Sequence, residues 1–125
     1  MITQNINHGR ESEEHRALKA EALQCLKNLG FGFVLCERQN CDLLGARKNT
    51  DAVLAVEIER SSRNLRRNIY RDLASGCAQI VIVCPNFKVT AEIARKLDRE
   101  LSPGLREKVG VITASALRMI APPQS

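Results

Sequence analysis

Apolar residues recur along the chain with a spacing that predicts alternating helices and strands. In the first third they follow the three- and four-residue rhythm of an amphipathic helix, at Leu18, Ala22, Cys25, Leu26 and Leu29. Ser12 is the expected N-cap of this helix, and Gly30 the expected stop. Apolar segments over residues 31–37, 42–46 and 53–59 then predict three strands, and their short connections are typical of an antiparallel meander.

The second half of the chain predicts helices and strands in alternation. Leu65, Ile69 and Leu73 make an apolar row on a helix that we expect to be capped by Ser61 or Ser62 and to end at Gly76. The continuous apolar run 79–84 is typical of a central strand buried on both faces. A helix over 88–101, ended by Ser102-Pro103-Gly104, a strand over 109–113 and a helix capped by Thr113 complete the series. The order αβββαβαβα predicts an α/β domain with a mixed sheet and helices on both faces.

Length and composition indicate one globular domain. The 125 residues suffice for one hydrophobic core, and a 44% hydrophobic and 26% charged composition excludes a disordered chain. We expect a flexible lead-in over residues 1–10, the domain over 11–121 and a tail over 122–125. Aromatic residues make up only 3%, which disfavours modules that bind single strands by stacking bases on aromatic rings.

Charge and cysteine content indicate the kind of partner and the cellular compartment to expect. A net charge of +5 favours a polyanionic partner. The five cysteines form no CxxC pair and most lie in apolar segments, so we expect buried thiols and no disulfide framework or zinc site. Neither a leader-like N-terminus nor a membrane-spanning apolar run is visible in the sequence, so a cytoplasmic location without membrane contact is expected.

Acidic side chains gather on two neighbouring strands of the predicted meander. Because side chains alternate along a strand, Glu57 and Glu59 share one face, opposite Val56 and Ile58, and Asp42 can join them from the preceding strand. Clustered carboxylates raise one another's pKa unless a cation neutralises them, and a hard divalent ion suits oxygen ligands. The alternative is an ordinary strand with one solvated face.

Three motifs in this order resemble the PD-(D/E)xK nuclease superfamily, which has the restriction-endonuclease-like fold. Asp42 stands for the first acid of the superfamily motif, and Glu57-Ile58-Glu59 for its (D/E)-x-K segment. The segments 14–18 (EHRAL), 56–59 (VEIE) and 68–76 (NIYRDLASG) are similar to a small single-domain subgroup. The resemblance extends from Glu14 to Ile120, and its specificity lies in the order and spacing of short motifs.

The resemblance implies an endonuclease that hydrolyses DNA with Mg²⁺ or Mn²⁺ and needs no organic cofactor. By this resemblance Asp42, Glu57 and the carbonyl of Ile58 hold the metal, and Glu14 contacts it directly or through water. Glu59 orients the attacking water or binds a second ion. Glu37, at the end of the first strand, is a lesser candidate.

Basic side chains on the second predicted helix supply the expected contacts to DNA. Asn68 and Arg71 would grip the scissile phosphate, while Arg63, Arg67 and Arg71 form a row facing away from the apolar stripe. Severing both strands of a duplex requires two sites, so a homodimer is expected.

Glu59 stands where the superfamily usually has Lys. The missing positive charge would come from Lys48, Arg60 or Arg71, with Lys48 also a candidate DNA contact, or from a second metal ion. If nothing replaces it, the chain is a catalytically inactive nuclease-fold module that binds DNA or a protein partner. A third interpretation is an α/β interaction domain without a nucleic-acid role.

Overall fold

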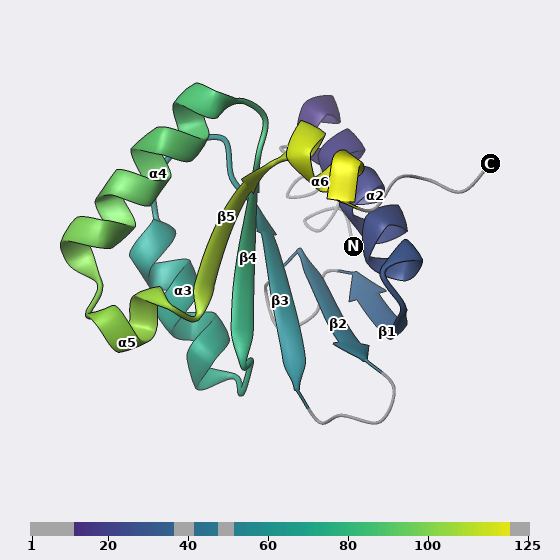
Figure 1. Ribbon diagram of the computed structural model, residues 1–125, viewed down its shortest axis with the longest axis horizontal. Coiled ribbons are helices and arrows are strands. Elements are labelled where there is room, and N and C mark those ends of the chain that lie inside the picture. The colour runs from purple at the N-terminus through teal and green to yellow at the C-terminus, as the bar shows by residue number, and fades with distance from the viewer. Residues whose placement is uncertain (1–11, 37–41, 48–51, 121–125) are drawn as a thin grey trace, which may run out of the picture.

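The computed structural model describes residues 12–36, 42–47 and 52–120, and it is an α/β domain built on a mixed sheet, as predicted (Figure 1). The strands lie in the order of the chain: β1 (Phe31–Cys36), β2 (Leu43–Arg47), β3 (Val53–Ile58), β4 (Gln79–Cys84) and β5 (Val109–Thr113). The pairs β1–β2 and β2–β3 are antiparallel, which confirms the meander, whereas β3–β4 and β4–β5 are parallel. The parallel half therefore ends all its strands at one edge of the sheet.

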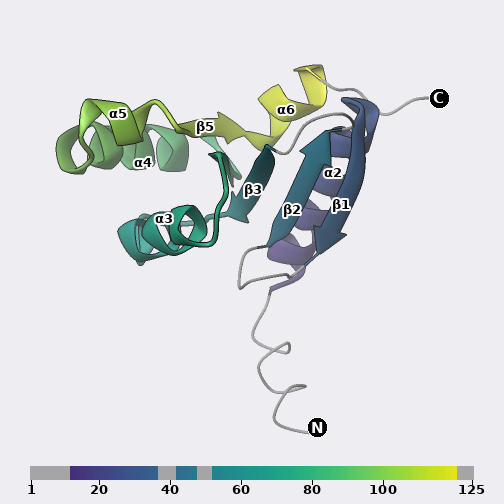
Figure 2. The same cartoon turned by 90° about the horizontal axis from the view of Figure 1, so that it is seen from below.

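Helices cover both faces of the sheet, as predicted. Figure 2 shows α2 (Glu13–Asn28) on one side of the strands and α3 (Leu65–Ala74) with α4 (Phe87–Glu100) on the other. The terminal α6 (Ala114–Ile120) packs with α2, and the short α5 (Pro103–Arg106) follows α4. The result is a three-layer domain with a hydrophobic core on each side of the sheet.

The first helix forms as its sequence predicts. The Ser12 side chain accepts a hydrogen bond from the backbone N–H of His15 at 3.0 Å, which satisfies one of the free donors at the helix start. Its apolar stripe buries Ala22, Cys25 and Leu26 against the sheet. Gly30 follows the helix with φ +93°, a conformation that favours glycine.

The core beneath α3 and α4 is the more fully closed of the two. Alternate residues of β4, Ile80 and Ile82, are completely buried there with Ile69 and Ile93. The other face of β4 departs from the prediction, because Gln79 is exposed and Val81 only partly buried. The strand is thus central by position but incompletely covered toward α2 and α6.

One helix boundary differs from the sequence prediction, and a short helix was not predicted. Helix α3 begins at Leu65, and neither Ser61 nor Ser62 caps it; the residue before it, Asn64, adopts a left-handed conformation with φ 61° and makes no side-chain cap. The predicted stop at Ser102 holds for α4, but the Ser102 side chain also caps α5. Arg63 consequently precedes α3 and does not lie on it.

Thr113 caps α6 as predicted, since its hydroxyl accepts a hydrogen bond from the backbone N–H of Ala116 at 3.0 Å. Cys25, Cys77 and Cys84 are buried free thiols, as expected, while the side chains of Cys36 and Cys41 lie outside the described part of the structure. Over the ranges that the structure describes, no helix is long and apolar enough to cross a membrane.

Candidate functional site

Asp42 lies directly beside the end of β3, where the two predicted acidic segments meet. Leu43 pairs with Val56 in the antiparallel ladder, so the residue before β2 comes next to the last residues of β3. The backbone N–H of Ile58 donates a hydrogen bond to Asp42 Oδ2 at 2.8 Å. This contact holds the carboxylate at the edge of the sheet where β3 and β4 both end.

Glu57 and Glu59 face α3, on the side of the sheet opposite Val56 and Ile58. Val56 and Ile58 belong to the core under α2, which confirms the alternation predicted from the sequence. Glu57 is only 4% exposed. Glu59 is partly exposed, and its Oε2 accepts a hydrogen bond from Asn68 Nδ2 at 3.1 Å.

Arg71 points toward the acidic residues from α3. Its Nη2 lies 3.2 Å from Glu57 Oε2 and 3.5 Å from Asp72 Oδ1, and its Nη1 donates to Asn68 Oδ1 at 3.2 Å. The predicted proximity of Asn68 and Arg71 is therefore correct. The prediction that Arg71 belongs to a solvent-facing row of arginines is wrong. Arg71 is next to the buried Asp72 on α3, and its side chain extends toward the sheet.

Asp72 is a member of this cluster that the sequence analysis missed. It is 1% exposed, and its Oδ2 has no hydrogen-bond partner among the residues that the structure describes. A buried carboxylate oxygen without a hydrogen-bond donor is costly, so the position of Asp72 is unusual even though Arg71 lies beside its Oδ1. A signal was present, since Asp72 follows Leu65 and Ile69 at helical spacing and thus lies on the apolar face of α3.

His15, and not Glu14, brings α2 to the site. His15 Nε2 lies 3.1 Å from Asp42 Oδ1, and both side chains are partly buried. The Glu14 carboxylate is 53% exposed and pairs at 2.9 Å with Nε of Arg60, whose Nη1 also donates to Ser12 Oγ. Glu14 was expected to reach the acidic residues, but in the structure it pairs with Arg60 instead. Helical spacing places His15 on the stripe of Leu18, one residue away from Glu14.

The acids of the cluster perturb one another's titration. Burial raises the pKa of Glu57 far above its ordinary range; the hydrogen bond and charge of Asp72 and the charge of Asp42 add to this, and Arg71 opposes it. Burial likewise raises the pKa of Glu59 to about 7, with Asn68, His15 and Arg71 opposing and Asp42 adding. Because the charge of Asp42 acts on both glutamates, the three carboxylates form one electrostatic unit.

The DNA-contact candidates outside this cluster are exposed or lie beyond the described residues. Arg63 and Arg67 are exposed. Lys48 falls outside the described ranges, as does Glu37, the lesser candidate for the acidic site. Within those ranges, no three His, Cys, Asp or Glu side chains converge in a geometry suited to a metal ion.

We call the set Asp42, Glu57, Glu59, Asp72, His15, Asn68 and Arg71 the β3-end cluster. Chemically it offers carboxylate oxygens, an imidazole and one guanidinium at the edge of a sheet. Comparisons of the chain with protein-family models, curated proteins and solved structures find no match.

Proposed function

We propose that the protein is a divalent-metal-dependent nuclease of the restriction-endonuclease-like fold, which hydrolyses phosphodiester bonds in DNA. The observation that carries this proposal is the convergence of Asp42, Glu57 and Glu59 at the end of β3, where burial and neighbouring charge raise the pKa of both glutamates. Acids are rarely buried together unless they are paired or hold a metal, and clustered groups with perturbed pKa values favour a functional site. The resemblance in motif order to the PD-(D/E)xK superfamily supports the same conclusion.

The donor chemistry of the cluster fits Mg²⁺ or Mn²⁺. Asp42, Glu57 and the backbone carbonyl of Ile58 would hold the ion, a set with only two side chains, so it does not require three converging acids. Each carboxylate oxygen can accept more than one interaction, and the contacts from His15, Arg71 and the Ile58 N–H leave further acceptor capacity. The bound ion would supply water activation and charge neutralisation at the phosphate.

Other residues of the chain have roles that follow from their positions. Glu59, with a pKa of about 7, is suited to accept a proton from the attacking water near neutral pH. Arg71 is the best candidate for the positive charge usually given by Lys, since its guanidinium lies against Glu57 inside the cluster, whereas Arg60 pairs with Glu14 and Ser12 outside it. Asn68 would assist Arg71 at the phosphate, and Arg63 with Arg67 would contact the DNA backbone.

A nuclease with one such site cuts one strand, so we propose a homodimer for cleavage of a duplex. Sedimentation of the protein with and without DNA tests this part, and a monomer under both conditions contradicts it.

The decisive experiment incubates the protein with supercoiled, linear, single-stranded and branched DNA in Mn²⁺, Mg²⁺ or chelator. We expect metal-dependent nicking that Asp42→Asn abolishes while DNA binding persists, because repulsion between the site and the phosphates falls. Asp98→Asn is the control, since Asp98 is an exposed aspartate of α4 paired with Arg106. Cleavage in chelator, no cleavage of any substrate, or full activity of Asp42→Asn overturns the proposal.

A second candidate is a module of the same fold that binds DNA or a protein partner without cutting. The observation in its favour is that Arg71 already pairs with Glu57, while Glu59 occupies the position of the usual Lys. Retention on DNA at low salt without cleavage in any metal would select this candidate over the nuclease.

A further inference from the structure

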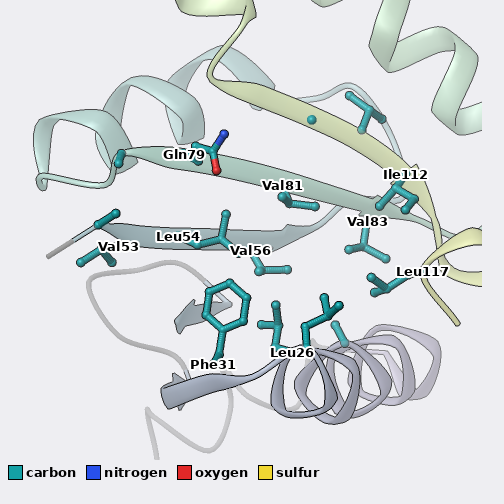
Figure 3. Close-up of a pocket in the computed structure, with 16 residues that line it drawn as sticks. Leu26, Phe31, Val53, Leu54, Val56, Gln79, Val81, Val83, Ile112 and Leu117 are labelled. Carbon is teal, nitrogen blue, oxygen red and sulfur yellow. The ribbon is translucent and has the colours of Figure 1, made fainter. Parts of the chain in front are cut away.

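A cavity of about 450 Å³ lies on the sheet face that α2 and α6 cover, away from the β3-end cluster. Figure 3 shows Leu26 and Phe31 on one side of it, pointing toward Leu54 and Val56 of β3 on the other. Its volume falls within the range of small-molecule sites, roughly 300–1,000 Å³.

The hollow arises because the second layer of helices is too small for the sheet. Helix α6 has seven residues and begins where β5 ends, so it covers only that end of the parallel strands. At the other end, Gly110 of β5 contributes no side chain, and a Cβ built there would meet nothing within 4 Å. Leu54, Val81 and Ile112 are consequently left only partly buried. A well-packed core leaves no such space.

The lining of the cavity selects for an uncharged occupant. Of the sixteen residues that line it in the described part of the chain, Gln79, at the exposed start of β4, is the only one with a polar side chain. A charged group would lose its hydration there without gaining an oppositely charged partner from the described lining. The amide of Gln79 can both donate and accept a hydrogen bond, which suits a hydroxyl or another neutral polar group.

The shape of this face argues for a small molecule over a second copy of the chain. A two-fold related copy brings the same surface patch to the interface. Flat contact between two hollowed faces would leave both hollows unfilled, which forfeits the packing that stabilises an interface. A flexible hydrocarbon chain fills an irregular hollow directly.

We propose that this cavity binds an uncharged, mainly hydrocarbon molecule with one hydrogen-bonding group, of the class of long-chain alcohols, with the polar group at Gln79. The site is independent of the proposed nuclease chemistry, and its occupant is a ligand and not a cofactor of DNA cleavage.

The test measures binding of the uncharged dye Nile red to the full-length protein by fluorescence, and its displacement by 1-decanol or by decanoate below its micelle concentration. We expect decanol to displace the dye at a concentration lower by about tenfold or more than decanoate, because the carboxylate resists burial.

Variants at two glycines locate the binding site. Gly110→Leu places a side chain in the cavity and should weaken dye and decanol binding by about tenfold or more, because the space is then filled. Gly104→Leu is the matched control, since a Cβ there also meets nothing within 4 Å but the residue lies in α5, outside the lining. Gly110→Val serves the same purpose if the leucine variant does not fold, since β-branched residues suit strands. Circular dichroism checks folding of each variant.

Three results would overturn the proposal. They are no dye binding by the unmodified protein, equal binding by a folded Gly110 variant, and equal displacement by decanol and decanoate. Sedimentation of the same samples tests whether a second copy of the chain occupies this face. A dimer that Gly110→Lys dissociates would assign the face to that second copy.

Discussion

At the residue scale, Arg71 is the one cation that contacts the buried acids of the β3-end cluster within the described structure. It lies between Glu57 and Asp72, and both carboxylates are at most 5% exposed. Removing one partner of such a group leaves an uncompensated buried charge, which costs more than the pair contributes. The local stability of the cluster therefore depends on Arg71.

We expect Arg71→Met to lower the free energy of unfolding by about 2–4 kcal/mol, because Asp72 loses its counter-charge and Glu57 loses a hydrogen-bond donor. In a Glu57→Gln background the same change should cost less, by about 1 kcal/mol or more. Urea denaturation of the four proteins measures this coupling. Arg66→Met, at an exposed arginine of the same helix, is the control and should change stability by less than about 0.5 kcal/mol. Additive effects in the cycle would contradict the pairing.

Glu59 makes the stability of the protein depend on pH. Its pKa is about 7 in the folded state against an ordinary value of 4.5, so the folded state binds the proton more tightly. Protonation of Glu59 therefore stabilises the folded state. This stabilisation is fully present below pH 4.5 and is lost as pH rises through 7.

Glu59→Gln, which cannot ionise, should therefore match the unmodified protein near pH 4.5 and be more stable at pH 8. Since Glu59 is partly exposed, solvent screening reduces the gain to about 1–2 kcal/mol. Urea denaturation at pH 4.5, 6 and 8 measures it, with Glu92→Gln on the exposed face of α4 as control. A difference that does not change with pH would contradict the burial of this carboxyl group.

At the scale of elements, the start of α3 decides which side chains the helix presents to the sheet. Asn64 takes a left-handed conformation immediately before the helix, and Leu65 and Ile69 are then completely covered. This turn changes the direction of the chain after β3, and in the resulting orientation of α3 Asn68 and Arg71 contact Glu59 and Glu57. The helix begins with neither a side-chain cap nor an acidic first turn, so packing of its apolar face must stabilise it.

Substitutions at Asn64 test this turn. Asn64→Gly should keep or slightly raise stability, whereas Asn64→Val should lower it by about 1–2 kcal/mol, because a β-branched residue resists a positive φ. Thermal unfolding of both variants compares them. Arg63→Val, at the preceding exposed residue, should have a much smaller effect, and an equal loss at both positions would contradict the backbone explanation.

At the scale of the whole molecule, three acids of the β3-end cluster are buried or partly buried, while two arginines beside that cluster are exposed. The acids Glu57, Glu59 and Asp72 gather inside the β3-end cluster, while Arg63 and Arg67 are solvent-exposed near the start of α3. With a net charge of +5, such a surface suits a polyanion.

Changing both Arg63 and Arg67 to Ala should weaken DNA binding through lost phosphate contacts. In Asp42→Asn protein, we expect the slope of log affinity against log salt to fall by about one for each lost contact, with little change in sequence preference. The control changes Arg95 and Arg99 of α4, which are equally exposed. An unchanged slope in the Arg63 and Arg67 variant would place DNA on another surface.

Local periodicity by itself determined most of the elements and the orientation of the acidic strand. The alternation along β3 put Glu57 and Glu59 on one face, and the spacing of Leu18, Ala22 and Leu26 predicted the buried stripe of α2. These features depend on neighbours in sequence, because backbone geometry alone sets which side chains share a face.

Only the tertiary structure decided which groups meet those acids. His15 contacts Asp42 while Glu14 turns to Arg60, and Arg71 and Asp72 point inward from α3. Neighbouring residues of a helix point in directions about 100° apart, so the rotation of the helix about its axis decides which of them contacts the acids. Packing of the helix against the sheet sets that rotation. Burial of a carboxylate likewise depends on what covers it. The pKa values of the cluster and the uncovered apolar face beside Gly110 are therefore properties of the packed molecule and not of any segment of its sequence.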